Sequence, residues 1–399
     1  MTYFRRTELA QQMAHKLLQP GILDQGLRSG LFLSGLRRTG KTTFLRQDLI
    51  PALEGMGAVV IYVDLWADTK ADPSTLVHAA IRKALDELRT PASGVLARLK
   101  RLKGLDLGAA GFKFGFQVAD VGARGGPTLA QALAEVVDRT RTDVVLIVDE
   151  VQQVLAGDEG SQLMLAIKAA RDAINPRPGT PGHFLFIGTG SHRAQVVGMT
   201  LQGKHAFEGA TSVDYPTLGE DYVDHMLQAI AHEGAKVRPS LAVAFTAFDT
   251  LGRRPEELIR ALRQLQQQEP GQADRYLPVI AATLKGAAAD VELRKIEDLG
   301  VLATAVFDRV ARAPGDATGL FAADSLAEYA SVVGREVTAD QVQRIAEELR
   351  NANIIMRKGH GVYAVTDPFV QQAWRDRKSL LAPGPKGGGK DAEPPATPL

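Results

Sequence analysis

The sequence predicts an α/β fold, in which a three-layer sandwich with a parallel sheet is followed by a helical lid and a winged-helix domain. Up to residue 216, short aliphatic stretches typical of buried strands alternate with amphipathic helices, and this alternation favours a parallel sheet covered by helices. Residues 219 to 290 have a helical pattern with little strand signal. Residues 296 to 377 have the pattern of three helices closed by a short hairpin, which is the winged-helix order.

Composition excludes several classes of protein. The 399 residues carry a net charge of +1, so we expect no general attraction to nucleic acid or to membranes. There are no cysteines, which excludes disulfides, thiol nucleophiles and cysteine zinc sites. The longest apolar run, residues 58 to 63, is too short to span a bilayer, and residues 1 to 6 do not begin a secretory signal. We therefore expect a cytoplasmic protein of two or three domains with no membrane partner.

A glycine-rich stretch, "GLRRTGKTT" at residues 35 to 43, is the first functional signal. Its spacing fits a phosphate-binding loop (P-loop), in which backbone amides surround a phosphate chain and a lysine reaches the outer oxygens. An aliphatic strand at 31 to 33 precedes the loop, and an amphipathic helix that we expect to end at Pro51 follows it. A basic surface turn is the alternative that the loop alone leaves open. The expected nucleotide-binding residues are Gly35, Leu36, Arg37, Arg38, Thr39, Gly40, Lys41, Thr42 and Thr43.

Two carboxylates follow a buried strand about a hundred residues later. Residues 144 to 148 are all aliphatic, and Asp149 and Glu150 come next, at the strand end where parallel sheets bind their ligands. We expect Thr42 and Asp149 to hold Mg²⁺ between them, and Glu150 to deprotonate a water that attacks a nucleotide γ-phosphate. Taken alone, the acidic pair could also be the polar exit of a strand.

Polar residues also follow the next predicted strand, in "GTGSHR" at residues 188 to 193. Thr189 and Ser191 are each placed to hydrogen-bond the γ-phosphate or the attacking water, and a polar turn is an equally good interpretation of either one.

The remaining elements of the sheet domain are predicted from periodicity. An inserted basic segment with a hairpin is expected at about residues 91 to 127, because "GFKFGFQV" at 111 to 118 alternates like a half-buried edge strand. DNA contact by its basic run, Arg98, Lys100, Arg101 and Lys103, is a less favoured alternative. Helices are expected at residues 7–18, 73–88, 128–140 and 161–174, and strands at 58–64, 184–187 and 211–215.

The C-terminal part begins with a recognisable helix start. Residues 338 to 341, "TADQ", form a capping box that opens a helix to Arg350, and two short strands around residues 359 to 361 follow it. From residue 382 the chain is rich in proline and glycine, which predicts disorder. The expected boundaries are 1–216 for the P-loop domain, 217–290 for the lid, 291–377 for the winged helix and 378–399 for the disordered tail.

With these motifs identified, the chain resembles the AAA-like P-loop ATPases common in archaea and bacteria. In that family a G-x-R-R-x-G-K-T loop, a D-E-x-Q strand end, a T-G-S strand end and a C-terminal winged helix recur in this order, as they do here between about residues 3 and 377. The resemblance implies an Mg²⁺-dependent ATPase that hydrolyses ATP to ADP and phosphate. It implies that Lys41 contacts the β- and γ-phosphates, that Glu150 activates water, and that Ser191 or Thr189 senses the γ-phosphate.

The resemblance also suggests roles for three arginines. "LGRRP" at 251 to 255 is similar to the family's G-G-x-P turn, so Arg253 or Arg254 could contact the γ-phosphate as a second sensor. A solvated turn is the more ordinary interpretation. Arg193 is a candidate for an arginine that acts in trans within a homo-oligomer, although no sequence feature shows such assembly.

Two functions remain open at this stage. A motor or remodelling enzyme would couple ATP hydrolysis to movement of the lid, whereas a slow ATP-dependent switch would bind DNA or a protein partner through the winged helix. The expected recognition helix carries both arginines and glutamates, and phosphate-dominated binding favours a clearer basic excess, so DNA contact is the less favoured output. ATPases of this type usually serve a protein partner encoded nearby. A nucleotide kinase fits less well, because it leaves Glu150 and the winged helix without a role.

Overall fold

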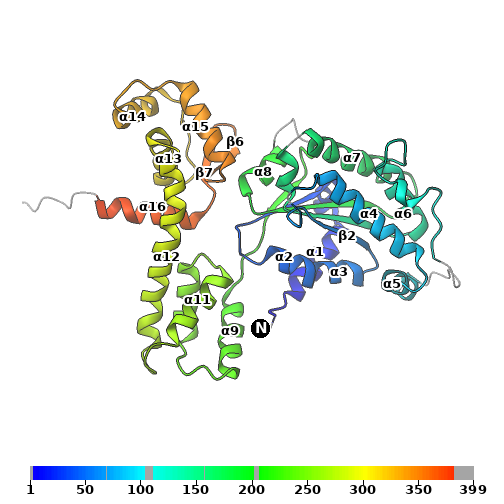
Figure 1. The fold of residues 1–399 in the computed structure, drawn as a ribbon, viewed down its shortest axis with the longest axis horizontal. Helices are drawn as coiled ribbons and strands as arrows, with labels where there is room; N and C mark the ends of the chain where they lie inside the picture. The colour runs from blue at the N-terminus through cyan, green and yellow to red at the C-terminus, as the bar shows by residue number, and fades with distance from the viewer. Residues whose placement is uncertain (1–2, 69, 104–110, 157, 202–205, 382–399) are drawn as a thin grey trace, which may run out of the picture.

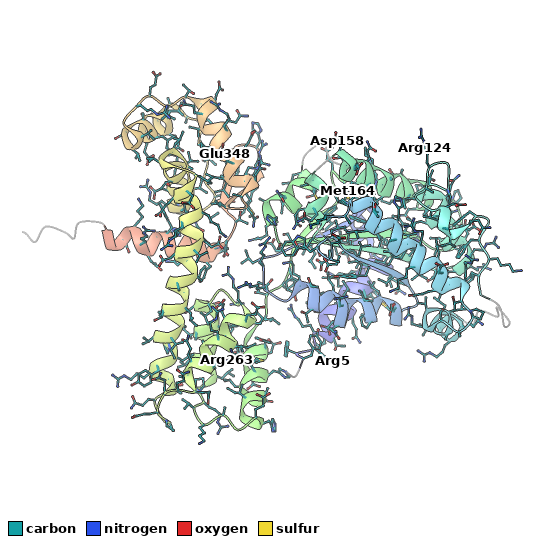
Figure 2. All side chains as sticks on the ribbon, in the orientation of Figure 1. Arg5, Arg124, Asp158, Met164, Arg263 and Glu348 are labelled. Carbon is teal, nitrogen blue, oxygen red and sulfur yellow. The ribbon has the colours of Figure 1, made fainter. Side chains whose placement is uncertain are left out.

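The computed structural model describes residues 3 to 381, except residues 69, 104–110, 157 and 202–205. Figure 1 shows two lobes, one built around a sheet and one made mostly of helices from the C-terminal half of the chain. Figure 2 has the same orientation, and in it Met164 marks the sheet lobe while Arg263 and Glu348 mark the helical lobe. Within the ranges just given, none of the helices combines the length and the apolar character that crossing a bilayer demands.

The sheet lobe is built on five parallel strands. They are β1 (Leu31–Ser34), β2 (Val59–Asp64), β3 (Val144–Asp149), β4 (Phe184–Gly190) and β5 (Thr211–Asp214). Their order in the sheet is β2-β3-β4-β1-β5. Because all strands are parallel, their carboxyl ends lie at one edge, where the P-loop, the acidic pair and the Thr-Gly-Ser motif begin. The predicted α/β fold with a parallel sheet is confirmed.

Helices cover both faces of this sheet. On one face the strands pack against α4, α6 and α7, and on the other against α1 and the helix that follows the P-loop. Leu146 of β3 points into the first core and Ile147 into the second, since successive side chains of a strand face opposite ways. The helices are α1 (Thr7–Leu18), α2 (Lys41–Phe44), α3 (Ile50–Gly55), α4 (Pro73–Arg89), α5 (Gly94–Lys103), α6 (Leu129–Thr140), α7 (Asp158–Ile174) and α8 (Arg193–Leu201), with shorter turns η1 (Ile22–Ser29), η2 (Leu45–Leu49), η3 (Val118–Asp120) and η4 (Val151–Ala156).

The helix after the P-loop does not end at Pro51, so that prediction is wrong. α2 continues through the π-helical turn η2 into α3, in which Pro51 is the second residue. Proline lacks an N–H group and clashes with a carbonyl of the preceding turn in a regular helix. The wider π-helical turn shifts the hydrogen bonds by one residue, which accommodates the proline and lets the helix run to Gly55.

The hairpin predicted within residues 91 to 127 is also wrong for the described residues, which contain no strand there. The basic run forms α5 instead. Leu96 and Leu99 of this helix are buried, while Arg98 pairs with Glu54 at 2.8 Å. This arginine therefore stabilises the packing of α5 on the lobe.

The alternating segment at 111 to 118 is irregular up to the short turn η3. Phe112 is buried in the core, and the rings of Phe114 and Phe116 stack with their centroids 5.8 Å apart. The backbone N–H of Gly115 donates to Glu135 of α6 at 2.6 Å. The aromatic residues recur at every second position because this loop packs on α6. That spacing is the same as in an edge strand, but the loop makes no strand hydrogen bonds.

The helical lobe consists of two small cores joined by one helix. The first core gathers α9 to α11 with the start of α12, and the second gathers the end of α12 with the elements that follow it. The expected boundary between residues 290 and 291 falls inside α12 (Figure 1). The elements are α9 (Glu220–His232), α10 (Leu241–Thr250), α11 (Pro255–Leu265), α12 (Ala273–Asp298), α13 (Val301–Arg312), α14 (Ala323–Val333), α15 (Ala339–Asn351), β6 (Ile355–Gly359), β7 (Val362–Val365) and α16 (Pro368–Leu381).

The C-terminal unit has three helices followed by the antiparallel pair β6–β7. The capping box at the start of α15 is present, since Thr338 and Gln341 bond each other's backbone N–H groups. The sequence predicts disorder from residue 378. That prediction is wrong for residues 378 to 381, because α16 extends to Leu381. Residues 382 to 399 lie outside the described part of the chain.

Candidate nucleotide-binding site

The P-loop connects β1 to α2 at the carboxyl edge of the sheet, and both of its glycines are required by the geometry. Gly40 has φ +90°, a left-handed conformation that glycine adopts without cost. A Cβ on Gly35 would lie 2.9 Å from the Cβ of Tyr215 and 3.2 Å from the Cδ of Lys41. Close packing therefore disfavours a side chain at Gly35, and the left-handed backbone disfavours one at Gly40, as expected of a loop that wraps a ligand.

Lys41 is buried inside this loop, with a residue exposure of 5%. Its Nζ donates to the carbonyl oxygens of Gly35 and Leu36, both at 2.8 Å. Burial lowers the pKa of Lys41 to about 8, although the nearby carboxylates of Glu150 and Asp149 act in the opposite direction. Among the described residues, this buried ammonium has two carbonyl oxygens as its hydrogen-bond partners, and an anion would stabilise its charge better.

Asp149 faces the P-loop directly. The Thr42 hydroxyl donates to its Oδ2 at 2.7 Å, and the Tyr62 hydroxyl donates to the same oxygen at 3.1 Å. Thr189, at the end of the intervening strand β4, donates to Oδ1. The structure thus brings the loop, the carboxylate and one of the two hydroxyl candidates into a single hydrogen-bonding network.

Glu150 and Ser191 form a second pair beside the first. Glu150 is 8% exposed and has φ +56°, a strained backbone for a non-glycine residue. Its Oε2 accepts hydrogen bonds from the Ser191 hydroxyl at 2.8 Å, from the Ser191 N–H at 3.2 Å and from the side chain of Gln152. Thr189 and Ser191, which the sequence could not separate, therefore contact different carboxylates.

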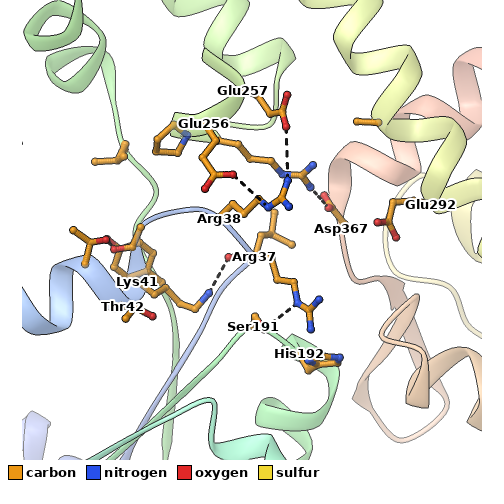
Figure 3. Close-up of a pocket in the computed structure, with 18 of the residues that line it drawn as sticks. Arg37, Arg38, Lys41, Thr42, Ser191, His192, Glu256, Glu257, Glu292 and Asp367 are labelled. Carbon is orange, nitrogen blue, oxygen red and sulfur yellow. Dashed lines mark hydrogen bonds and ion pairs between the residues drawn. The ribbon is translucent and has the colours of Figure 1, made fainter. Parts of the chain in front are cut away.

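A cleft of about 1160 Å³ lies between the two lobes and includes this site (Figure 3). Its sheet-lobe wall contains the P-loop, Glu150, Ser191 and His192, and its helical-lobe wall contains the start of α11, one side of α12 and Asp367. In Figure 3, Glu256 and Glu257 face Arg38 of the P-loop, which lies 3.4 Å from Glu256 and 3.9 Å from Glu257. The cleft is large enough for a nucleotide and opens onto both lobes.

Of the two candidate arginines in the lid, only Arg254 lines the cleft. It pairs with Asp367 and its guanidinium lies 4.8 Å from the centroid of the Phe369 ring. Arg253 has φ +53°, pairs with Asp249 at 2.8 Å and lies over Phe245, outside the cleft. The left-handed backbone at this turn sends the two adjacent side chains in different directions.

Arg193 is held within its own chain. It donates to Asp214 at 2.6 Å and to the carbonyl of Thr366 at 3.2 Å, and its side chain is 14% exposed. A role in trans would require it to break both contacts. The remaining loop arginine, Arg37, donates to the Ser191 hydroxyl at 3.4 Å and lies 4.7 Å from the centroid of the Trp66 ring.

The N-terminal wall of the cleft has no counterpart among the sequence motifs. Tyr3, Phe4 and Arg6 line it, and Arg6 donates to the Tyr215 hydroxyl at 3.0 Å and to the Pro216 carbonyl at 2.6 Å. Apart from Arg6, this wall is aromatic and apolar, and it lies beside the P-loop. Its remaining lining residues are Tyr215, Leu218, Tyr222 and Met226.

No protein-family model matches the sequence, and no curated protein matches it. Among solved structures, the Aeropyrum pernix ORC2 protein in ADPNP–ADP complexes aligns at 14% identity over 96% of both chains, with a TM-score of 0.48. The Aeropyrum pernix ORC1 protein in complex with DNA aligns at 16% identity over 95% of this chain and 94% of that one, with a TM-score of 0.37.

The Thermotoga maritima RuvB Holliday junction branch migration motor aligns at 14% identity over 93% of this chain and 94% of that one, with a TM-score of 0.34. All three alignments extend over most of both chains at low sequence identity. Their TM-scores are below 0.5, so the assignment of the site rests on the sheet order and the side-chain contacts of this chain instead.

The pKa of Lys41 predicts how nucleotide affinity depends on pH. Well below pH 8 the ammonium stays charged, so Lys41 itself should add no pH dependence to ATP affinity. Above the pKa of about 8, binding requires proton uptake by Lys41, so affinity should fall by up to about tenfold per pH unit. Isothermal titration in EDTA between about pH 6.5 and about pH 9.5 measures this slope.

Lys41→Arg is the matched control, because a guanidinium stays charged throughout that range. Whatever its absolute affinity, this variant should lose the slope. An ATP affinity of the wild type that is constant up to about pH 9.5 would contradict the role of Lys41.

Proposed function

We propose that this protein is an Mg²⁺-dependent ATPase that couples ATP hydrolysis to movement of the helical lobe relative to the sheet lobe. The observation that carries the proposal is the 2.7 Å contact between Thr42 and Asp149, beside a buried lysine and at the bottom of the cleft between the lobes. If the loop were a surface turn and the acidic pair a polar strand exit, Thr42 and Asp149 would be solvated and far apart. Their convergence from positions 107 residues apart favours a built site.

The donor set fits Mg²⁺. A hydroxyl oxygen and a carboxylate oxygen 2.7 Å apart are the hard ligands that this ion uses, and phosphate oxygens and water would complete its shell. Thr42 and Asp149 would hold the ion, which when bound would neutralise charge on the phosphate chain. The aromatic wall formed with Tyr3 and Phe4 supports a purine nucleotide as the occupant of the same cleft.

The residues of the chain supply three further actions. Lys41 would exchange its two carbonyl partners for phosphate oxygens, which stabilise its charge better. Ser191 lies between Glu150 and Arg37 and would hydrogen-bond the γ-phosphate. Glu150 would accept a proton from a water held in line with the phosphate to be released.

One contact between the lobes and one ion pair within the helical lobe support coupling to movement. Arg193 follows Ser191 by two residues and donates to the Thr366 carbonyl, while Arg254 in the lid pairs with Asp367. Both arginines thus hold the turn that begins α16. Burial raises the pKa of Asp367, and Arg254 opposes that shift. A shift of Ser191 towards a phosphate would be transmitted to the C-terminal unit through this turn.

The second candidate is a slow ATP-dependent switch whose output is the C-terminal unit. Its helix–helix–helix–ribbon order favours a winged helix, with a protein partner or DNA as the target. Exposed residues of α15 include Arg344 but also Glu347 and Glu348, and Lys358 of the ribbon pairs with Asp316 at 2.8 Å. This mixed charge favours a protein partner, for which a product of a neighbouring gene in the cytoplasm is the first candidate. High basal turnover would favour the motor, and ATP retention with negligible turnover would favour the switch.

Glu150→Gln should retain ATP and block its hydrolysis. The amide keeps the shape of the side chain but cannot accept the proton, and loss of a general base typically lowers kcat by about 10²–10⁴-fold. Filter binding with labelled ATP and steady-state phosphate release measure the two properties.

Lys41→Ala is the companion variant and should lose ATP binding itself. Normal turnover in Glu150→Gln would remove Glu150 from the reaction, and unchanged ATP affinity in Lys41→Ala would remove the P-loop assignment.

Asp367→Asn should weaken the ATP-dependent change in distance between the lobes. Removing one partner of the Arg254–Asp367 pair, whose side chains are 16% and 18% exposed, leaves a buried guanidinium unpaired and should also cost about 3 kcal/mol of stability. The chain has no cysteine, so Asp158→Cys and Glu348→Cys provide unique label sites on the two lobes (Figure 2) for distance measurements with and without ATP.

Asp249→Asn is the control, because it breaks the exposed Arg253–Asp249 pair of the same turn, which is worth about 1 kcal/mol or less. An undiminished distance change in Asp367→Asn would show that the turn before α16 does not couple the lobes.

A further inference from the structure

The side chain of Gln152 is buried between Glu150 and the wall of the cleft. It is 4% exposed, and its Nε2 donates to Oε2 of Glu150 and lies 3.3 Å from Nδ1 of His192. His192 in turn lines the cleft. The amide therefore connects the acid expected to activate water with a side chain that a cleft ligand can reach.

The backbone at the end of β4 leaves a slot for this amide. A Cβ on Gly190 would lie 2.1 Å from Oε1 of Gln152 and 2.7 Å from Cγ2 of Val196. Any side chain at position 190 would therefore displace the glutamine. Oε1 of Gln152 is itself buried without a hydrogen-bond partner, a costly arrangement for a polar atom that calls for an explanation.

The explanation lies in how Glu150 is held. Its Oε2 accepts hydrogen bonds from the N–H and hydroxyl of Ser191 and from Gln152, whereas within the described residues no hydrogen bond reaches its Oε1. One oxygen of the carboxylate is thus anchored by three donors, and the other is left for a water in the cleft that Glu150 lines.

We propose that Gln152 is a positioning residue that fixes the Glu150 carboxylate for proton abstraction, with His192 holding the orientation of the glutamine amide. This inference rests on the proposed ATPase function. Burial, together with Arg37, lowers the pKa of His192, which favours the neutral ring whose Nδ1 can accept from the amide. When the Ser191 hydroxyl turns to the γ-phosphate, the Ser191 N–H alone would leave the carboxylate free to rotate, and the amide of Gln152 removes that freedom.

Gln152→Met tests the proposal, because methionine preserves length and volume but donates no hydrogen bond. We expect kcat to fall by at least about tenfold while KM for ATP stays within about twofold, since the glutamine acts on the reacting geometry and does not line the cleft. A purely structural role would instead lower thermal stability and ATP binding together.

A double-mutant cycle with Glu150→Gln identifies the route of the effect. Because Gln152 acts through Glu150, adding Gln152→Met to Glu150→Gln should cause no further loss in single-turnover hydrolysis of labelled ATP. His192→Phe should lower kcat by about threefold on its own and should add nothing in the Gln152→Met background. If Gln152→Met does not fold, His192→Phe in the wild type and in Glu150→Gln provides the same cycle.

The outcomes separate this inference from the proposed function. An active wild type, an inactive Glu150→Gln and a fully active Gln152→Met would overturn the positioning role alone. The positioning role would also be overturned if Gln152→Met lowered the hydrolysis rate by the same factor in the wild type and in Glu150→Gln. A wild type without ATP turnover would overturn both.

Discussion

The hydrogen bond from the Thr42 hydroxyl to the Asp149 carboxylate is the contact on which the site depends. The strand that leads into the P-loop and the strand that ends at Asp149 are separated by β4, so their terminal residues must reach across one strand. Thr189 at the end of β4 closes the gap by donating to the same carboxylate. The strand order thereby converts two distant sequence motifs into one polar network, and the cleft, the lid and the N-terminal wall are arranged around it.

The site is assembled at a cost to the stability of the empty protein. Arg38 and Glu150 have φ of +64° and +56°, and strain of this kind costs about 1–3 kcal/mol per residue. Lys41 is buried with a lowered pKa, which is a second unfavourable feature of the empty site. A bound triphosphate would stabilise the charge of the buried Lys41 and would contact the loop whose backbone is strained at Arg38. The same anion would compete with Glu256 for Arg38, which links occupancy of the loop to the lid.

The sequence predicts the sheet and the motifs well because both are local signals. A short aliphatic run with no polar face favours a buried strand, and a P-loop needs its glycines at fixed spacing. The sequence misses two kinds of feature. Some depend on contacts between distant residues, and others have a sequence pattern that fits two different local structures. A proline often ends a helix, and here a π-helical turn lets the helix continue past Pro51. Phenylalanines at every second position suit a strand and an irregular loop equally. Asp367 and Arg6 reach the cleft from distant segments that no local pattern connects to the P-loop.

The central claim is that Thr42 and Asp149 belong to one Mg²⁺–nucleotide site, and the Mg²⁺-dependent gain in ATP affinity tests it most directly. This gain is the ratio of ATP dissociation constants in EDTA and in Mg²⁺, measured for the wild type, Thr42→Val, Asp149→Asn and the double variant. Each single variant should lose most of the gain and the double variant should lose little more, because both side chains act on the same ion. Full retention of the gain in either single variant, or independent and additive losses, would contradict it.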